Sequence, residues 1–600
     1  MARLYQPIEI LTPLGVNDRD ARMGGYPNES TNCRNVDFFG DHISTRKGRD
    51  RYNTARNGSG LDIYSLHYFT DETGAGHLLK TADDAIWLGS ALSKTGTWTS
   101  KRAGFTADKV WTSTTFVEGT RIYLALTNGV DAPQKYDPQT GDVTDLSDDA
   151  DLPKGQLCFT LADRVFIGPM TATDQDFRFE HSKDLDVAGA TSWSEANNFV
   201  QIPGRSIPKG GVVMGDVAFV LNEEEIFAIL YTGDAVTPFW IRRVGDMGTL
   251  SFQTIKVLPG ENAFVFLGTD GMVYKFDLQY RLEKIGVKIP GVLFGSDDTD
   301  FSGLNKAQIA GAVAGVDPEL QKYMLFAPDA GDSYNSLALD YYWGTKLIDI
   351  DPVSRRGSGL FLGQWFYSDA DVRAIVVGRD SNDKRVILTS SGKPDYVTGT
   401  VSISAGGVVT GSGTAFDQSM VGNDFIPTST GTAFVVTSVA GATSLQLTSY
   451  TEGAVAAGEA FTISRRGIVF QQDSGASDDG AAIDSFWFSR WHTHGRMDLF
   501  KHFPEMDVIT RNVGDWLLQV NHMVDFQDGV GLQKTINLAP DSAIVGTAIV
   551  GTAVIGSLGA VPRKVPTNSY GKAIRYRFRT NGLNEKFTLY GYIPYVEATS

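Results

Sequence analysis

The chain repeats one short pattern, in which an apolar run ends at Gly, Asp or Asn and a second apolar run follows. The clearest copy is FVFLGTDGMVYKFD at residues 264–277. Here residues 264–267 and 272–276 are predicted to form two antiparallel strands, because Thr269-Asp270-Gly271 supplies a tight turn between them. Further copies stand at residues 79–90, 119–125, 163–168, 216–230, 322–326 and 385–392.

A series of short strand pairs favours an all-β fold made of several small sheets. One small sheet cannot bury both of its faces, so such sheets pack side by side around an axis. The copies recur at irregular intervals, around the roughly 40 to 50 residues that a four-stranded sheet needs. We therefore predict that residues 56–395 form a degenerate β-propeller. A string of unrelated β-sandwiches is the alternative.

Residues 396–464 differ in composition from the rest of the chain. They contain no Lys or Arg, and Val, Thr, Ser and Gly alternate with a period of two. Because charged residues flank this stretch on both sides, we predict that 396–466 is a small β-sandwich or barrel module inserted into the larger unit. Residues 1–55 are predicted to be an N-terminal docking arm of strands. Residues 467–600 are predicted to be a β-rich region that completes the propeller, with a hairpin turn at Asn581-Gly582.

The formal net charge of −17 argues against a protein that wraps nucleic acid over a broad surface. Two cysteines, Cys33 and Cys158, provide no disulfide framework, and two free thiols are expected rather than one bridge. The first residues, MARLYQPIEI, lack the apolar core of a signal peptide.

No enzyme signature stands in the sequence. It contains no phosphate-binding G-x-x-x-x-G-K-[ST], no G-x-G-x-x-G after a strand, no G-x-S-x-G and no H-E-x-x-H. We therefore expect a protein that is not an enzyme and that carries no cofactor. Acidic clusters at 147–151 and 296–300 are expected to be solvated turns, with calcium binding as the alternative.

One constellation has the side chains of a metal site. The segment WHTHGRMDLFKH, residues 491–502, contains His492, His494, Asp498 and His502. In a strand, the first two side chains would project to the same face and could share a zinc or iron ion. The alternative is that the ring nitrogens bond to backbone at the end of a strand.

A basic cluster stands near the start of this acidic chain and contains Arg46, Lys47, Arg49 and Arg51. In an extended chain the last three alternate onto one face, with Arg46 on the other. Such an edge could bind the acidic rim of a partner or the phosphates of DNA. It could equally be a solvated edge strand that its charges protect from pairing.

The uncharged segment 543–561 has a length that suits a membrane span, but it holds four Gly, two Thr and one Ser. Its five-residue rhythm presents no constant helical face. A hairpin or ordered loop buried against protein is therefore expected, with a membrane-inserting element as the alternative.

Several motifs of this chain follow one another in an order that is similar to the order found in one protein family. LGVNDRDA (14–21) leads to NVDFFGDHISTRKGRDRY (35–52), and the repeats follow. SFWFSRWHTHGRMDLFKHFPEMDVI (485–509) precedes GTAIVGTAVIG (546–556). This order resembles the tail-tube nozzle and packaged-DNA stabilisation proteins of short-tailed bacteriophages. The stretch GTVSISAGGVVTGSGTAF (399–416) is similar to small β modules of phage virion proteins.

The resemblance implies a virion protein of the phage tail, assembled in the bacterial cytoplasm. It implies that several copies, six in number, form a homo-oligomeric ring below the portal and adaptor. This ring would form the lower tail channel, and residues 467–600 would face the tube. The ring would retain packaged DNA and let it pass without sequence-specific binding, while fibres dock outside and the host envelope is contacted transiently. An acidic lumen would repel phosphates, so that DNA slides. The basic cluster is then a docking edge.

Two other classes of function remain. One is a carbohydrate-binding or capsule-degrading tail protein that recognises the host surface, since tryptophans can stack on sugars. The other is a bacterial surface or solenoid scaffold. The candidate tryptophans for sugar binding are Trp87, Trp98, Trp193, Trp240, Trp343 and Trp365.

Overall fold

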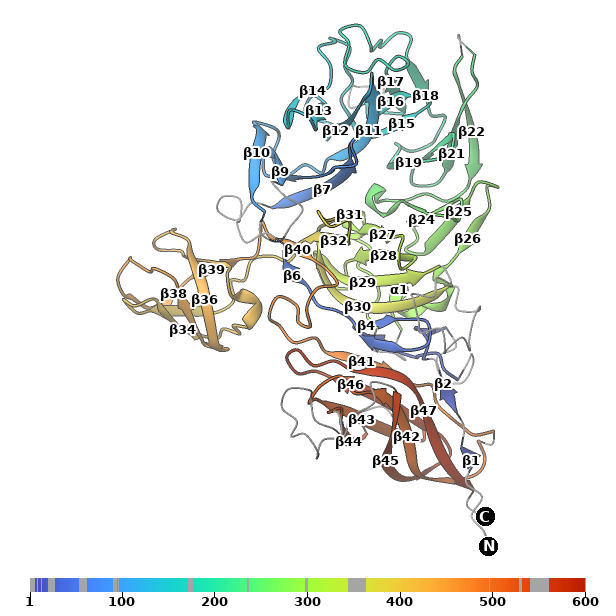
Figure 1. Ribbon diagram of the computed structural model, residues 1–600, viewed down its shortest axis with the longest axis vertical. Helices are drawn as coiled ribbons and strands as arrows, with labels where there is room; N and C mark the ends of the chain where they lie inside the picture. Colours follow the sequence, from blue (N-terminus) through green and yellow to red (C-terminus); the bar gives the residue numbers. More distant parts are fainter. Residues whose placement is uncertain are drawn as a thin grey trace, which may run out of the picture.

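Seven four-stranded antiparallel sheets stand in a closed circle in the computed structural model of the chain, each touching the next through its innermost strand. These sheets are the blades of a β-propeller, which occupies the upper part of Figure 1. The predicted all-β propeller with an inserted module is therefore confirmed. The structure describes residues 6–7, 9–11, 13–19, 27–52, 62–89, 94, 96–170, 176–234, 237–296, 301–343, 363–495, 497–527, 531–539 and 560–598.

Six blades are each contiguous in sequence, and their strands run in order from the axis outward. The first three blades are β7 (Ile63–Thr70), β8 (Gly76–Ala82), β9 (Ala85–Gly89) and β10 (Trp98–Ala103); β11 (Thr112–Glu118), β12 (Arg121–Thr127), β13 (Gln134–Asp137) and β14 (Asp142–Asp145); and β15 (Gly155–Leu161), β16 (Arg164–Met170), β17 (Arg178–His181) and β18 (Phe199–Gln201). The next three are β19 (Gly210–Met214), β20 (Val217–Leu221), β21 (Ile226–Tyr231) and β22 (Phe239–Gly245); β23 (Lys256–Leu258), β24 (Ala263–Leu267), β25 (Val273–Asp277) and β26 (Leu282–Lys284); and β27 (Val313–Asp317), β28 (Lys322–Ala327), β29 (Asn335–Tyr342) and β30 (Gln364–Val372).

The clearest repeat of the sequence is a strand pair, as predicted. Strands β24 and β25 pair antiparallel, with Phe264 opposite Phe276, and Gly271 takes a positive φ of 85° in the turn between them. Every residue of β24 is buried, because neighbouring blades cover both faces of the sheet. This explains why the strand is a continuous apolar run rather than an alternating one.

The seventh blade combines segments from three parts of the chain. Its strands, from the axis outward, are β31 (Ala374–Arg379), β32 (Arg385–Ser390), β40 (Val469–Gln471) and β6 (Asp50–Arg51). Phe470 of β40 stands between Thr389 of β32 and Arg51 of β6. Because β31 contacts β7 of the first blade, the N-terminal strand β6 helps to close the circle.

The inserted module leaves the seventh blade between β32 and β40 and projects to the left in Figure 1. Its seven strands form one sheet around a separate hydrophobic core that includes Val401, Phe425, Val436 and Ile463. The strands are β33 (Thr400–Ile403), β34 (Val408–Ser412), β35 (Asp424–Pro427), β36 (Phe434–Gly441), β37 (Ser444–Leu447), β38 (Val455–Glu459) and β39 (Phe461–Ser464), with a 3-10 helix η4 (Gln418–Met420).

Below the propeller in Figure 1, the two ends of the chain share a β-sandwich. One sheet contains β1 (Gln6–Pro7), β2 (Ile10–Leu11), β4 (Val36–Phe38), β5 (Ile43–Thr45), β42 (Lys501–Arg511), β45 (Ala560–Gly571) and β47 (Thr588–Ala598). The other contains β3 (Cys33–Arg34), β41 (Ser485–Phe488), β43 (Leu517–Val524), β44 (Leu532–Asn537) and β46 (Ile574–Thr580).

The predicted hairpin at Asn581-Gly582 is wrong. Strand β46 pairs with β41 and β43, whereas β47 pairs with β42 and β5 in the other sheet. The chain therefore crosses between sheets at this point. An Asn-Gly pair marks a turn, but it does not determine which strand the chain pairs with afterwards.

One hydrophobic cluster continues from the propeller into the sandwich. It contains Val265 and Leu325 of the blades together with Trp487 and Tyr592 of the sandwich. The indole of Trp487 donates a hydrogen bond of 3.0 Å to the carbonyl of Leu14, which ties the N-terminal segment to this core. The two parts are thus joined by packed side chains as well as by the chain itself.

Helices are short in the described part of the chain: α1 (Pro290–Phe294), and the 3-10 helices η1 (Phe252–Thr254), η2 (Gly286–Lys288) and η3 (Ile309–Gly311). None of these described helices is long and apolar enough to span a membrane.

Cys33 and Cys158 are both free thiols. Residues 543–559 of the uncharged segment and 297–300 of the second acidic cluster lie outside the described residues.

Candidate functional site

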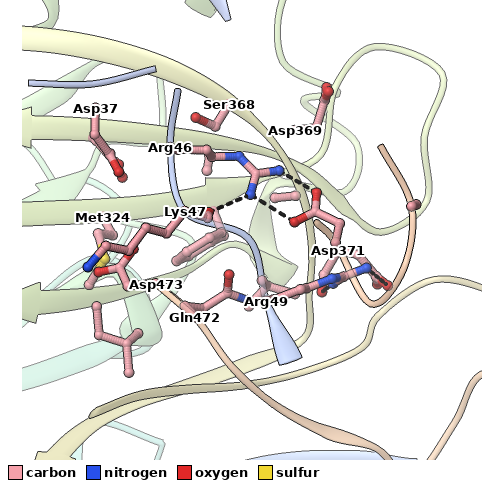
Figure 2. Close-up of a pocket in the computed structure, with 18 of the residues that line it drawn as sticks. Asp37, Arg46, Lys47, Arg49, Met324, Ser368, Asp369, Asp371, Gln472 and Asp473 are labelled. Atoms are coloured by element: carbon pink, nitrogen blue, oxygen red, sulfur yellow. Dashed lines mark hydrogen bonds and ion pairs between the residues drawn. The ribbon is translucent and has the colours of Figure 1, made fainter. Parts of the chain in front are cut away.

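A charged cavity of about 250 Å³ lies where the last two blades, the inserted module and the N-terminal segment meet. Figure 2 shows that Arg46, Lys47 and Arg49 of the predicted basic cluster lie at this cavity. Its cationic lining residues are Arg46, Lys47, Arg49, Lys322, Lys393 and Arg465, and its acidic ones are Asp37, Asp340, Asp369, Asp371, Asp417, Asp473 and Asp478.

Arg46 forms a bidentate ion pair with Asp478, and its Nη1 lies 2.9 Å from Oδ1 of that carboxylate. Its Nε also donates to the side-chain oxygen of Asn35 at 2.9 Å. The arginine side chain is only 11% exposed. Burial raises the pKa of Asp478, but the charge and hydrogen bonds of Arg46 outweigh it and hold this pKa below its usual value.

Arg49 pairs with Asp371, with Nη2 at 3.3 Å from Oδ2, and its guanidinium lies 4.6 Å from the ring centre of Phe470. The Asp371 carboxylate also accepts hydrogen bonds from the hydroxyl of Ser391 and from two backbone amides, those of Gly392 and Lys393, at 2.7–2.9 Å. This carboxylate therefore holds the segment that leads from the blade into the inserted module.

Arg51 contacts two parts of the chain at once. Its Nη2 lies 2.8 Å from Oδ2 of Asp479, which precedes the sandwich, and 3.1 Å from the side-chain oxygen of Asn423 in the module. The same nitrogen donates to the carbonyl of Val421 at 2.5 Å. One guanidinium thus joins blade, module and the approach to the sandwich.

Lys47 is the exposed member of the basic cluster. It lines the cavity together with Asp473. Burial raises the pKa of Asp473, but the positive charges of Lys322, Arg385 and Lys47 outweigh this effect and hold the pKa below its usual value. Lys47 therefore contributes positive charge to the cavity and also presents it to solvent.

A buried lysine, Lys322, is among the residues that line the cavity. The ammonium of Lys322 is 3.1 Å from Oδ2 of Asp340 and 3.8 Å from Oδ1 of Asp37, and the side chain is 4% exposed. Burial raises the pKa of Asp340 to about 6, although Lys322 opposes this shift. Two carboxylates and one ammonium form a compact group here, in which each charge has a partner.

The arginines of the basic cluster thus pair with carboxylates of their own chain, a use that was not among the three sequence-based interpretations. Docking to an acidic partner stays a prediction, and Lys47 is the cation best exposed for it. Sequence reasoning missed Asp371, Asp478 and Asp479. The only signal was the adjacent acids in SGASDDG (474–480), and the chain has 70 acids.

The predicted metal-binding side chains are distributed over different contacts. His492 bonds through Nε2 to the hydroxyl of Tyr592 at 2.8 Å, and His502 pairs through Nδ1 with Glu597 at 2.8 Å. The rings of His492 and His494 are 6.1 Å apart, and His494 lies in a turn at a φ of 49° rather than in a strand. Among the described residues, no three or more His, Cys, Asp or Glu side chains lie close enough together to hold a metal ion. Asp498 is therefore not part of such a group either.

The six candidate sugar-stacking tryptophans have mostly structural positions. Trp193, Trp343 and Trp365 are buried, and Trp87 and Trp98 pack against a hydrophobic cluster between the first and seventh blades. Trp240 is 55% exposed on β22. These positions do not form a shared aromatic platform.

No family model and no curated protein matches the chain. Among solved structures, the chain is similar to one titled "Crystal structure of RRP9 WD40 repeats". The sequences are 9% identical, the match covers 57% of this chain and 92% of that chain, and the TM-score is 0.31.

Proposed function

We propose that this chain is a non-enzymatic structural protein of a bacteriophage tail, assembled in the host cytoplasm and carried in the virion. In this proposal several copies, six by the sequence resemblance, form a ring below the portal and adaptor proteins. The ring is the lower tail channel, which retains packaged DNA and lets it pass during ejection. Tail fibres dock on its outside.

The observation that carries the proposal is the path of the N-terminal segment. Strands β1 to β5 pair within the sandwich, and β6 then pairs with β40 in the seventh blade. A single segment therefore joins the outer strand of the propeller to both sheets of the sandwich. A subunit of a channel under load needs this property, because its parts must not move independently.

The size of the axial cavity supports a channel made between copies. The cavity along the propeller axis has a volume of about 430 Å³ and is lined by residues of all seven innermost strands. A B-DNA duplex, whose major groove alone is about 12 Å wide, does not fit there. In the proposal, DNA therefore passes through a lumen that several subunits enclose.

The charged cavity supports a structural role as well. Its arginines and carboxylates are engaged in ion pairs between distant segments, as Arg46 with Asp478 and Arg49 with Asp371. Groups that are paired in this way stabilise an arrangement of segments, and they are not poised as a free acid and base.

Native mass spectrometry of the purified full chain, alone and mixed with neighbouring tail proteins, tests the proposal. We expect a closed homo-oligomer, with six copies as the main species. A chain that stays monomeric in both samples contradicts the proposal. A monomer that binds host capsule on a glycan array would favour the carbohydrate-binding alternative instead.

A further inference from the structure

The axial cavity of the propeller has an unusual electrostatic character for this chain. Of the residues that line it, Lys256 is the one with a permanent charge, and the described lining contains no Asp or Glu. The whole chain has 70 acidic and 53 basic residues, so a cavity without acids is not what its composition predicts. The lining comes from β7, β11, β15, β19, β23, β27 and β31, together with the 3-10 helix η1 and residues next to these elements.

Lys256 is the first residue of β23, and it has no counter-charge in the described structure. Lys275 of the same blade pairs with Glu261 at 2.7 Å, whereas Lys256 forms no ion pair with any described residue. Burial lowers its pKa, and no carboxylate acts to raise it. Lys256 is partly exposed, so its ammonium loses only part of its contact with water, but it gains no ion pair in return. A bound anion would therefore stabilise it.

Neutral hydrogen-bond donors surround the same space. Gln253 lies three residues before Lys256 and lines the cavity, and no described residue bonds to its side-chain amide. His67 bonds through Nδ1 to the hydroxyl of Ser113 at 2.8 Å and through Nε2 to that of Ser65 at 2.9 Å. Burial, with Lys256 nearby, lowers the pKa of His67 to about 3, so that the imidazole is neutral.

We propose that the axial cavity binds one small oxyanion of the phosphate or carboxylate class, held by the Lys256 ammonium and the Gln253 amide. The volume of about 430 Å³ lies within the range of small-molecule sites, roughly 300–1,000 Å³. It accommodates a phosphate or the phosphate end of a small organic molecule. The anion binds the folded propeller in preference to the unfolded chain, because the cavity that encloses it forms only when the seven blades surround the axis.

Isothermal titration calorimetry of the full-length protein with inorganic phosphate tests this site, with acetate and chloride at equal ionic strength as further arms. We expect saturable binding at one site per chain and a rise in Tm with phosphate. Preference for acetate over phosphate would assign the site to carboxylates. Chloride should not reproduce either effect.

Lys256→Met is expected to weaken phosphate binding at least tenfold and to raise the Tm of the anion-free protein, because an uncompensated ammonium is removed. Lys284→Met, on the exposed strand β26 of the same blade, removes the same charge and should leave binding unchanged. Gln253→Ala, which changes no charge, should weaken binding by a smaller factor and provides the test if Lys256→Met does not fold. Equal binding by wild type, Lys256→Met and Gln253→Ala, or no saturable binding by wild type, would overturn the proposal.

Discussion

Arg51 and Asp479 are 428 residues apart in the sequence, yet Nε of the arginine lies 3.0 Å from both carboxylate oxygens of the aspartate. The arginine belongs to the outermost strand of the seventh blade, and the aspartate belongs to the segment that leads into the sandwich. This bidentate pair therefore joins the two parts of the molecule at the point where the circle of blades is closed.

Loss of this pair should destabilise the junction. The two side chains are only 19% and 16% exposed, so Arg51→Met leaves a carboxylate largely buried without its partner. We expect the free energy of unfolding to fall by about 2–3 kcal/mol. Urea denaturation measures the change. Arg281→Met, which removes an arginine that is 76% exposed and paired with Asp277, is the control and should cost less than about 1 kcal/mol. Equal effects of the two variants would contradict this account.

The inserted module should fold without the propeller, because its core is separate. Its ends lie together, since Tyr396 and Ile463 exchange two backbone hydrogen bonds of 3.0 and 2.8 Å. We expect a fragment of residues 395–466 to give dispersed amide signals in NMR and cooperative unfolding. Phe425→Ala, which removes a fully buried ring stacked on Phe461, should cost about 3–5 kcal/mol and unfold the fragment. A disordered wild-type fragment would show that the module depends on the blade.

Acidification should destabilise the third blade through His181. Burial lowers the pKa of this histidine to about 4, although a hydrogen bond from Nδ1 to the carbonyl of Ser182 partly opposes the shift. The unfolded chain takes up its proton near pH 6.5, so stability is complete above that pH and is lost as the pH falls toward 4. Between these values His181→Gln should reduce the pH dependence of the unfolding free energy by about 1 kcal/mol per pH unit. Urea denaturation at pH 7, 6 and 5 measures it, and an unchanged slope would refute the assignment.

Lys47 offers a test of docking that leaves the ion pairs intact. Since it is the exposed cation of the basic cluster, Lys47→Gln should change stability by less than about 0.5 kcal/mol. If the cluster docks on an acidic neighbour, the variant should bind the adjoining tail protein at least tenfold more weakly in calorimetry. Lys306→Gln, at another exposed lysine, is the matched control. Unchanged binding by Lys47→Gln would remove the docking role.

The local parts of this fold could be predicted from the sequence. Strands β24 and β25 are joined by five residues, so their pairing follows from the apolar runs and the turn between them. The pairing of Arg51 with Phe470 could not be predicted in the same way, because strands that are distant in sequence carry no mutual signal in one chain. For the same reason the number of blades, seven, does not follow from the sequence.

The sequence indicates which cations belong to the candidate site, but it does not indicate which carboxylates pair with them. Arg46, Arg49 and Arg51 stand out in an acidic chain, but nothing near them in sequence indicates Asp478, Asp371 or Asp479. Which acid approaches a given arginine depends on the closure of the blades. In the histidine segment, the sequence suggested a grouping that the fold does not form. His492 and His494 alternate in sequence, but they do not share the face of a strand because the chain turns at His494.

The central claim is that copies of this stiff two-part subunit enclose a channel for DNA. Electron micrographs of the purified protein, assembled with its neighbouring tail components, test it most directly. We predict class averages of a hollow wheel with sixfold symmetry and a lumen wide enough for duplex DNA. Images of separate particles, or of a closed assembly without a central opening, would contradict the account.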